Sequence, residues 1–174
     1  MSKLKDYIII EASKSDIRQI QDLSDIAFRS TYKDILSAEQ LEYMMEWMYS
    51  SESLQNQFEQ GHRYFIAYLD DTPVGYASLQ SEGTDDGVQV FHLQKLYVLP
   101  SEQGCGLGRM LFEHAAGLAL ESAKGQVARL ELNVNRSNPA VDFYKHLGLK
   151  ILRQGDFPIG CGFYMNDYIM GIDL

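Results

Sequence analysis

Hydrophobic residues follow a helical period in the first third of the chain. After residue 15 they recur every three or four positions, which predicts a helix with one buried stripe. This stripe comprises Ile17, Ile20, Leu23, Ile26 and Ala27. A second helix is predicted from Ser37, where Gln40 completes the spacing of a capping box. A third, short helix is expected over 53–60, ending at Gly61.

Seven segments are rich in β-branched and aromatic residues and predict strands. They are 7–12, 64–69, 74–79, 88–99, 127–134, 149–153 and 163–174. A turn over 70–73 predicts a hairpin, and the polar run 81–87 is expected to be a loop. Two more helices are predicted between strands, one up to Lys124 and one over 138–147. The first of these is expected to bury Met110, Leu111, His114, Ala115 and Leu118. Hairpins together with βαβ units predict an α/β (α+β) fold with a mixed sheet.

Composition narrows the class of protein. The 174 residues, 45% of them hydrophobic, suit one domain spanning 1–174, and we find no repeat or linker. No apolar run is long enough to span a membrane, and the run 7–10 is too short for a signal peptide. The net charge of −9 argues against nucleic-acid binding. Two cysteines, Cys105 and Cys161, favour a reducing cytoplasm over a disulfide scaffold. No Cys/His cluster has metal-ligand spacing, so no metal is expected.

The stretch "LPSEQGCGLGRMLFEHAAGLAL", residues 99–120, places a glycine-rich turn before a helix. It lacks the spacing of a Walker A loop, and its third glycine is one residue early for a dinucleotide fingerprint. Gly106 and Gly108 lack a Cβ, so several backbone N–H groups can converge on an anion at the helix start, with Arg109 adjacent. The glycines alone are equally compatible with a plain strand-to-helix turn.

The surroundings of this turn carry a family resemblance. "LYVLPSEQGCGLGRMLFEHA" and "LNVNRSNPAVDFYKHLGL" resemble the fourth strand, cofactor loop and later strand–helix unit of GCN5-related N-acetyltransferases (GNAT). The resemblance covers nearly the whole chain and implies a mixed, mostly antiparallel central sheet flanked by helices. It also implies acetyl-CoA as the acyl donor. "LSDIAFRSTYKDILSAEQLEYMMEWMYS" and "FYMNDYIM" resemble the PaiA-like branch, similar to spermidine/spermine acetyltransferases.

The resemblance assigns cofactor contacts residue by residue. It implies that the backbone of Leu96, Tyr97 and Val98 binds pantetheine, with the Val98 N–H also facing the oxyanion. It implies a pyrophosphate loop made of Gln103, Gly104, Cys105, Gly106, Leu107, Gly108 and Arg109. Asn138 matches a further cofactor contact. Tyr144 matches the tyrosine that protonates the departing thiolate, although a core aromatic beside Phe143 is the alternative interpretation.

The general base is less defined. A free amine is needed for attack on a thioester, so the site must accept a proton. Where many family members carry glutamates on the fourth strand, this chain has His92 and Gln94. His92 has a suitable ordinary pKa, and ordered water is an equal alternative.

The acceptor is the most open assignment. On the first two helices, carboxylates and aromatic rings suited to a polyamine are Tyr32, Glu39, Glu42, Tyr43, Glu46 and Trp47. Core aromatics with solvated glutamates explain the same pattern. Three functions follow: acetylation of a small polyamine-like amine, acetylation of a peptide or protein amine, and a non-catalytic acyl-CoA-binding module. The sequence leaves a homodimer open.

Overall fold

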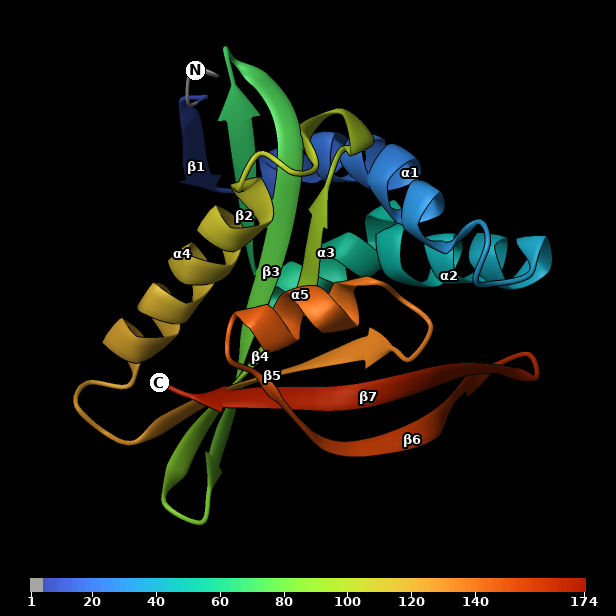
Figure 1. Ribbon diagram of the computed structural model, residues 1–174. Coiled ribbons are helices and arrows are strands. Elements are labelled where there is room, and N and C mark those ends of the chain that lie inside the picture. The colour runs from blue at the N-terminus through green and yellow to red at the C-terminus, as the bar shows by residue number, and fades with distance from the viewer. Residues whose placement is uncertain (1–4) are drawn as a thin grey trace.

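The computed structural model describes residues 5–174 and contains a seven-stranded sheet (Figure 1). The strands are β1 (Tyr7–Glu11), β2 (Arg63–Leu69), β3 (Thr72–Asp85), β4 (Val88–Val98), β5 (Ala128–Asn135), β6 (Lys150–Gly160) and β7 (Phe163–Asp173). Their order is β1-β2-β3-β4-β5-β7-β6, and only the β4–β5 pair is parallel. The predicted α/β fold with a mixed, mostly antiparallel sheet is therefore confirmed.

Five α-helices cover the two faces of this sheet. They are α1 (Ile17–Tyr32), α2 (Ala38–Tyr49), α3 (Ser51–Glu59), α4 (Leu107–Ser122) and α5 (Ala140–His146), with short 3₁₀ turns η1 (Lys14–Asp16) and η2 (Pro100–Glu102). The helices α1–α3 lie behind the sheet in Figure 1, and α4 and α5 lie in front. Of the described helices, none has the length and apolarity needed to cross a membrane.

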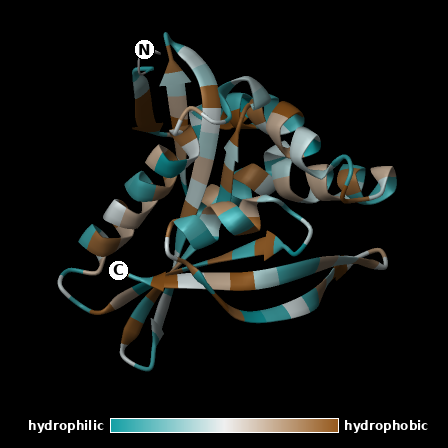
Figure 2. Ribbon diagram, in the orientation of Figure 1, coloured by the Kyte–Doolittle hydropathy of each residue, from teal (hydrophilic) through white to brown (hydrophobic). Residues whose placement is uncertain are grey.

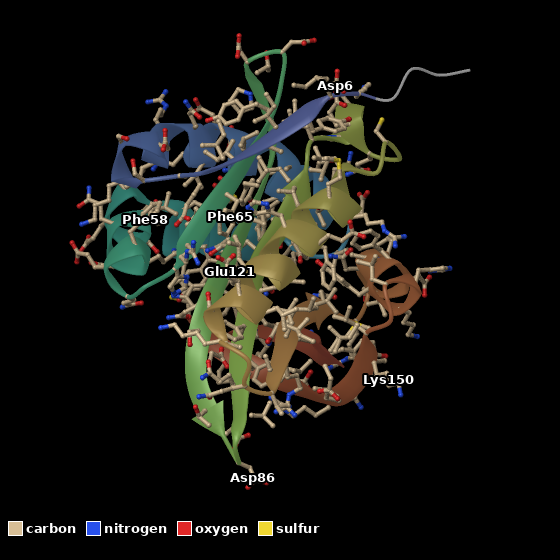
Figure 3. All side chains as sticks on the ribbon, turned by 90° about the vertical axis from the view of Figure 1, so that its left-hand side faces the viewer. Asp6, Phe58, Phe65, Asp86, Glu121 and Lys150 are labelled. Atoms are coloured by element: carbon tan, nitrogen blue, oxygen red, sulfur yellow. The ribbon has the colours of Figure 1, made fainter. Side chains whose placement is uncertain are left out.

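Each face of the sheet has its own hydrophobic core. Side chains alternate along β2, so Tyr64 and Ile66 pack under α1–α3 while Phe65 and Ala67 pack under α4. Figure 3 looks onto the α4 side, where Phe65 is labelled. Figure 2 marks hydrophobic positions in brown along the strands and helices. The sheet is thus covered on both sides.

Helix starts follow the sequence with small shifts. The Ser37 hydroxyl accepts from the backbone N–H of Gln40 at 3.1 Å, as expected for the start of α2. α1 begins after Asp16, which forms no side-chain capping bond; the capping box belongs to the preceding turn η1, where Asp16 Oδ2 accepts from the Ser13 N–H at 2.9 Å. Two residues expected to be buried, Ile26 and Met110, are 54% and 39% exposed because their stripes are narrower than expected.

Two strands are longer than expected. The run 81–87 was expected to be a loop, but β3 continues through Asp85 and turns only at Asp86-Gly87. Residues 81–87 of this exposed arm contain no apolar side chain, and main-chain hydrogen bonds between β3 and β4 hold the arm together. Figure 3 shows Asp86 at its tip. Likewise β6 extends to Gly160, beyond the expected 149–153, because it pairs with β7 along its length. Thr72 and Pro73, expected in a turn, belong to β3.

The two central parallel strands separate. Pairing of β4 with β5 runs only from Gln89 to His92, which lies opposite Glu131. Two residues later, Gln94 has no partner in β3, since Lys95 pairs with Ser78 and Leu93 with Leu79. Such a bulge increases the local twist of a strand. The carboxyl ends of β4 and β5 consequently diverge, as Figure 1 shows.

Candidate functional site

A cavity of about 620 Å³ lies where β4 separates from β5. Nine of the residues assigned to cofactor binding line it: Leu96, Tyr97, Val98, Gln103, Gly104, Gly106, Gly108, Arg109 and Asn138. The wall is completed by six residues that the sequence did not single out for the site: Ser30, Thr31, Glu102, Pro139, Ala140 and Phe143. They come from α1, η2 and the start of α5, which only the tertiary fold brings to this place.

The glycine loop presents backbone donors to this cavity. Gly104 and Gly106 have φ angles of 78° and 84°, in the left-handed region that glycine adopts without strain. α4 begins at Leu107, and the first N–H groups of a helix have no partner within it. With the positive end of the helix dipole, these donors suit an anionic group. Of the other assigned loop residues, Cys105 is exposed at the loop tip, and Leu107 is buried beneath it.

A buried carboxylate anchors the same loop. Glu102 is 7% exposed and accepts from Lys5 Nζ at 2.8 Å and from the Tyr7 hydroxyl at 2.6 Å. Lys5 thereby compensates a negative charge that would otherwise face the anion-binding donors. The first strand of the sheet is in this way connected to the start of the loop, 95 residues later.

The end of β4 leaves one backbone edge open. The N–H of Leu99 donates to the Val74 carbonyl in β3 at 2.9 Å. Successive N–H groups of a strand point to opposite edges, so the Val98 N–H points toward the gap left by β5. This orientation suits both roles expected for β4, namely pairing with an extended ligand and donation to a carbonyl oxygen.

Asn138 and Tyr144 lie on either side of the start of α5. Asn138 Oδ1 accepts from the Ala140 N–H at 2.9 Å, and its Nδ2 donates to the Tyr32 hydroxyl at 3.4 Å. Tyr144 is 7% exposed and packs against Phe112 and Phe143, with ring centroids 6.4 and 5.2 Å away. Burial raises the pKa of Tyr144, which keeps its phenol protonated at neutral pH.

His92 lies away from the cavity lining. It sits on β4 before the strands separate, with Nδ1 3.2 Å from Glu82 Oε1. Six residues separate it from Val98, a strand length of roughly 20 Å. Burial lowers the pKa of His92, and the charge of Glu82 partly offsets this effect. Its role as general base stays a prediction.

The residues considered for the acceptor divide into two groups. Tyr32 is buried, and Tyr43 donates to the Ile159 carbonyl at 2.5 Å, which docks the tip of the β6–β7 hairpin on α2. Glu42 forms an ion pair with Arg29, and Trp47 is 46% exposed. Glu39 and Glu46 are exposed as well. The described helices thus carry both structural aromatics and a solvated acidic surface.

A buried lysine lies on the opposite face of β4 from the glycine loop. Lys95 Nζ donates to Gln57 Oε1 and to the Tyr64 hydroxyl, each at 2.7 Å, and lies 5.3 Å from the centroid of the Tyr49 ring. Among residues 5–174, no carboxylate pairs with it. Burial lowers the pKa of Lys95 to about 7. Sequence reasoning missed this residue, because its burial depends on contacts with α2, α3 and β2, which are distant in the sequence.

The fold and cavity correspond to a known class of protein. The chain belongs to the Acetyltransferase (GNAT) family, whose sequence model matches residues 22–149. The family resemblance is therefore confirmed. It is 38% identical over 82 residues to the peptidyl-lysine N-acetyltransferase YjaB of Escherichia coli, covering 47% of this chain and 44% of that protein. The chain thus spans about half the length of the curated relatives it matches.

Solved structures agree on the fold over the whole chain. The PaiA N-acetyltransferase of Thermoplasma acidophilum, solved in complex with coenzyme A, has a TM-score of 0.76 at 23% identity, covering 97% of this chain and 99% of that one. A GCN5-related N-acetyltransferase of Rhodopseudomonas palustris has a TM-score of 0.79 at 20% identity, covering 100% and 99%. At these identities the likeness establishes the fold alone.

Proposed function

We propose that this protein is an acetyl-CoA-dependent N-acetyltransferase that acts on a primary amine at the end of a slender alkyl chain, with a small polyamine-like acceptor favoured. The observation that carries the proposal is the cavity of about 620 Å³ between the diverging strands, where the glycine loop meets an open strand edge. A donor with a pyrophosphate and an extended pantetheine arm has the chemistry that these two surfaces bind.

Each part of the site has a task in this proposal. The N–H groups at the start of α4, with Arg109, hold the pyrophosphate, and the open edge of β4 binds the pantetheine amides. The N–H of Val98 stabilises charge that develops on the carbonyl oxygen. Tyr144 supplies the proton for the departing thiolate, since its raised pKa keeps the phenol protonated. Acetyl-CoA supplies the activated acetyl group when bound.

The preference for a slender acceptor rests on the contacts between α2 and the β6–β7 hairpin. The β6–β7 hairpin docks on α2 through Tyr43 to Ile159 and through Gln40 Nε2 to the Tyr164 carbonyl at 2.7 Å. These contacts bridge the space between α2 and the hairpin tip, which disfavours a broad peptide backbone there. The net charge of −9 and the exposed glutamates of α2 attract polycations.

A lysine side chain in a peptide is the second candidate acceptor. It ends in the same unbranched alkylamine, and the relative YjaB is named a peptidyl-lysine N-acetyltransferase. Thiol release from acetyl-CoA should be followed with spermidine, spermine, N-α-acetyl-lysine amide and a lysine-containing peptide. A higher kcat/KM for the polyamines supports the first acceptor, and the reverse order supports the second. Binding of acetyl-CoA without turnover of any amine would leave only a non-catalytic module.

Gly106 provides a test of the donor site. Its φ of 84° is left-handed, a conformation that costs an alanine about 1–2 kcal/mol, and a Cβ there would meet no atom of the protein. The added methyl group therefore projects into the space proposed for the pyrophosphate. Gly106→Ala should weaken acetyl-CoA binding by about tenfold or more, measured by calorimetry.

Gly87 offers a matched control for this substitution. It has a φ of 79° and equally open surroundings, but it lies at the tip of the β3–β4 arm, away from the cavity. Gly87→Ala carries the same backbone strain and should leave acetyl-CoA affinity unchanged. Equal losses of affinity in both variants would attribute the effect to stability and contradict the pyrophosphate assignment.

A further inference from the structure

Asp167 is a buried acid without a cationic partner. It lies on β7, is 2% exposed, and its Oδ2 accepts from Asn133 Nδ2 at 3.3 Å, a long hydrogen bond. No cation of the described residues forms an ion pair with its carboxylate. The nearby Arg136 binds the Asp167 carbonyl at 3.4 Å and directs its other nitrogen to Asp156 at 2.6 Å. Burying a carboxylate without a cationic partner lowers the stability of the folded protein, which indicates that Asp167 serves a function.

The strand register places Asp167 on the face of the sheet opposite α4 and α5. It lies directly across from Asn135, and side chains of directly opposed residues share a face. On β5, Leu132 and Val134 pack under α4 and α5, so the alternating Asn133 and Asn135 point to the α1–α3 side. Asp167 therefore reaches the gap between the strands from the side opposite the glycine loop.

Asn135 connects Asp167 with the wall of the cavity. Asn135 pairs directly with Asp167 across the β5–β7 ladder, and its carbonyl accepts from the backbone N–H of Asn138 at 2.9 Å. Asn138 lines the cavity, and its Nδ2 donates to the Tyr32 hydroxyl at 3.4 Å. Asp167 therefore lies behind the wall that Asn138 forms, and its charge contributes to the raised pKa of Tyr32 after the larger effect of burial.

Resting on the proposed function, we infer that Asp167 is the catalytic residue that binds the acceptor ammonium and accepts its proton. His92, in contrast, pairs with Glu131, four residues before Asn135, or about 13 Å along β5. Burial raises the pKa of Asp167, while the hydrogen bond from Asn133 and the charge of Arg136 lower it. A raised pKa makes a carboxylate a better proton acceptor near neutral pH.

The proton balance of the reaction is complete with this assignment. The ammonium gives one proton to the Asp167 carboxylate, and the free amine nitrogen then forms a bond to the acetyl carbon. The carbon–sulfur bond breaks, and its electron pair leaves on sulfur, which takes the proton of Tyr144. The second amine proton passes to the Tyr144 phenolate through solvent, and Asp167 releases its proton to water. One amide, one thiol and one proton are formed.

Asp167→Asn tests the inference because it keeps the shape and removes the base. We expect kcat/KM for an alkylamine to fall about 100-fold at neutral pH, with acetyl-CoA affinity unchanged. O-Methylhydroxylamine, whose nitrogen is already unprotonated at neutral pH, should be acetylated at nearly the wild-type rate. Asp173→Asn, which changes an exposed carboxylate at the far end of the same strand, is the matched control and should behave as wild type.

The outcomes separate a base from a structural carboxylate. A selective loss with alkylamines, together with disappearance of the acidic limb of the pH–rate profile, supports Asp167, and His92→Gln should then retain that limb. Equal losses with both nucleophiles, or an unchanged profile, would overturn the inference. Both results require that the wild-type protein acetylates an amine, so a failure of the proposed function is recognised independently.

A binding measurement tests Asp167 without turnover. In the presence of CoA, calorimetry should detect n-butylamine binding to the wild type and at least tenfold weaker binding to Asp167→Asn. The ammonium loses a buried counter-charge in this variant, and a tenfold change in affinity corresponds to about 1.4 kcal/mol. Equal affinities, or no binding to either protein, would overturn the inference.

Discussion

Replacing Lys95 with methionine is expected to stabilise the protein by several kcal/mol at about pH 6.5. Burial lowers the pKa of Lys95 to about 7, so the folded state disfavours the ammonium relative to the unfolded chain. Each unit of pKa difference corresponds to about 1.4 kcal/mol, so a lowering from 10.5 to about 7 amounts to roughly 5 kcal/mol. Methionine has a similar length and no charge to bury. The remaining polar groups stay paired, since the Tyr64 hydroxyl donates to Gln57 at 2.5 Å.

The same substitution should flatten the pH dependence of stability. Below about pH 7 both states of the wild type carry the ammonium, and the cost of burying it is full. Between about pH 7 and 10 the unfolded state binds more protons at Lys95 than the folded state, so wild-type stability rises with pH. Lys95→Met should lose this rise, and its advantage should shrink as the pH increases. Urea unfolding at several pH values from about 6.5 to 9.5 measures both effects.

The pH window and a surface variant isolate the contribution of Lys95. Burial also lowers the pKa of His62, to about 4, and its effect is confined below the ordinary histidine pKa of 6.5. Lys33→Met removes an exposed lysine and should change neither the stability at about pH 6.5 nor the slope. A Lys95→Met protein that is less stable than wild type, with the slope retained, would contradict the buried-ammonium explanation.

Local patterns were sufficient for most of the fold. Helical spacing of apolar residues, β-rich segments and glycine ends located all the α-helices and β-strands of residues 5–174, although not the two short 3₁₀ turns. They failed where pairing of the main chain alone extends a strand, as in the polar arm that ends at Asp86 and in β6 beyond Arg153. Such segments have no buried side to produce a hydrophobic period.

The site was predictable where its chemistry lies in contiguous residues. Five of the seven assigned loop residues and Asn138 line the cavity, because turn geometry and a helix start are local properties. Asp167 and Lys95 were missed because nothing near them in sequence is unusual. Their burial depends on pairing of β5 with β7 and on packing of α3 against the sheet, which are contacts between distant segments.

Tyr144→Phe is expected to lower kcat by about 100-fold, or about 2.7 kcal/mol of barrier, with acetyl-CoA affinity unchanged. Phenylalanine keeps the ring packing against Phe112 and Phe143 and removes only the hydroxyl. Without a phenolic proton, the sulfur must leave as a free thiolate at neutral pH. The loss should shrink above about pH 8.5, where a thiolate is stable in water. Steady-state thiol release across this pH range, with calorimetry for acetyl-CoA, measures both effects.

Tyr68 provides the matched control for loss of a hydroxyl. Its phenol donates to Gln19 Oε1 at 2.7 Å on β2, whereas Tyr144 follows the lining residue Phe143 and packs against its ring. Tyr68→Phe should retain kcat at every pH, since it removes a hydrogen bond without removing an acid from the site. A Tyr144→Phe deficit that stays constant with pH would indicate that the hydroxyl positions α5 and does not donate the proton. An unchanged kcat would show that Tyr144 is a core aromatic residue without a catalytic role.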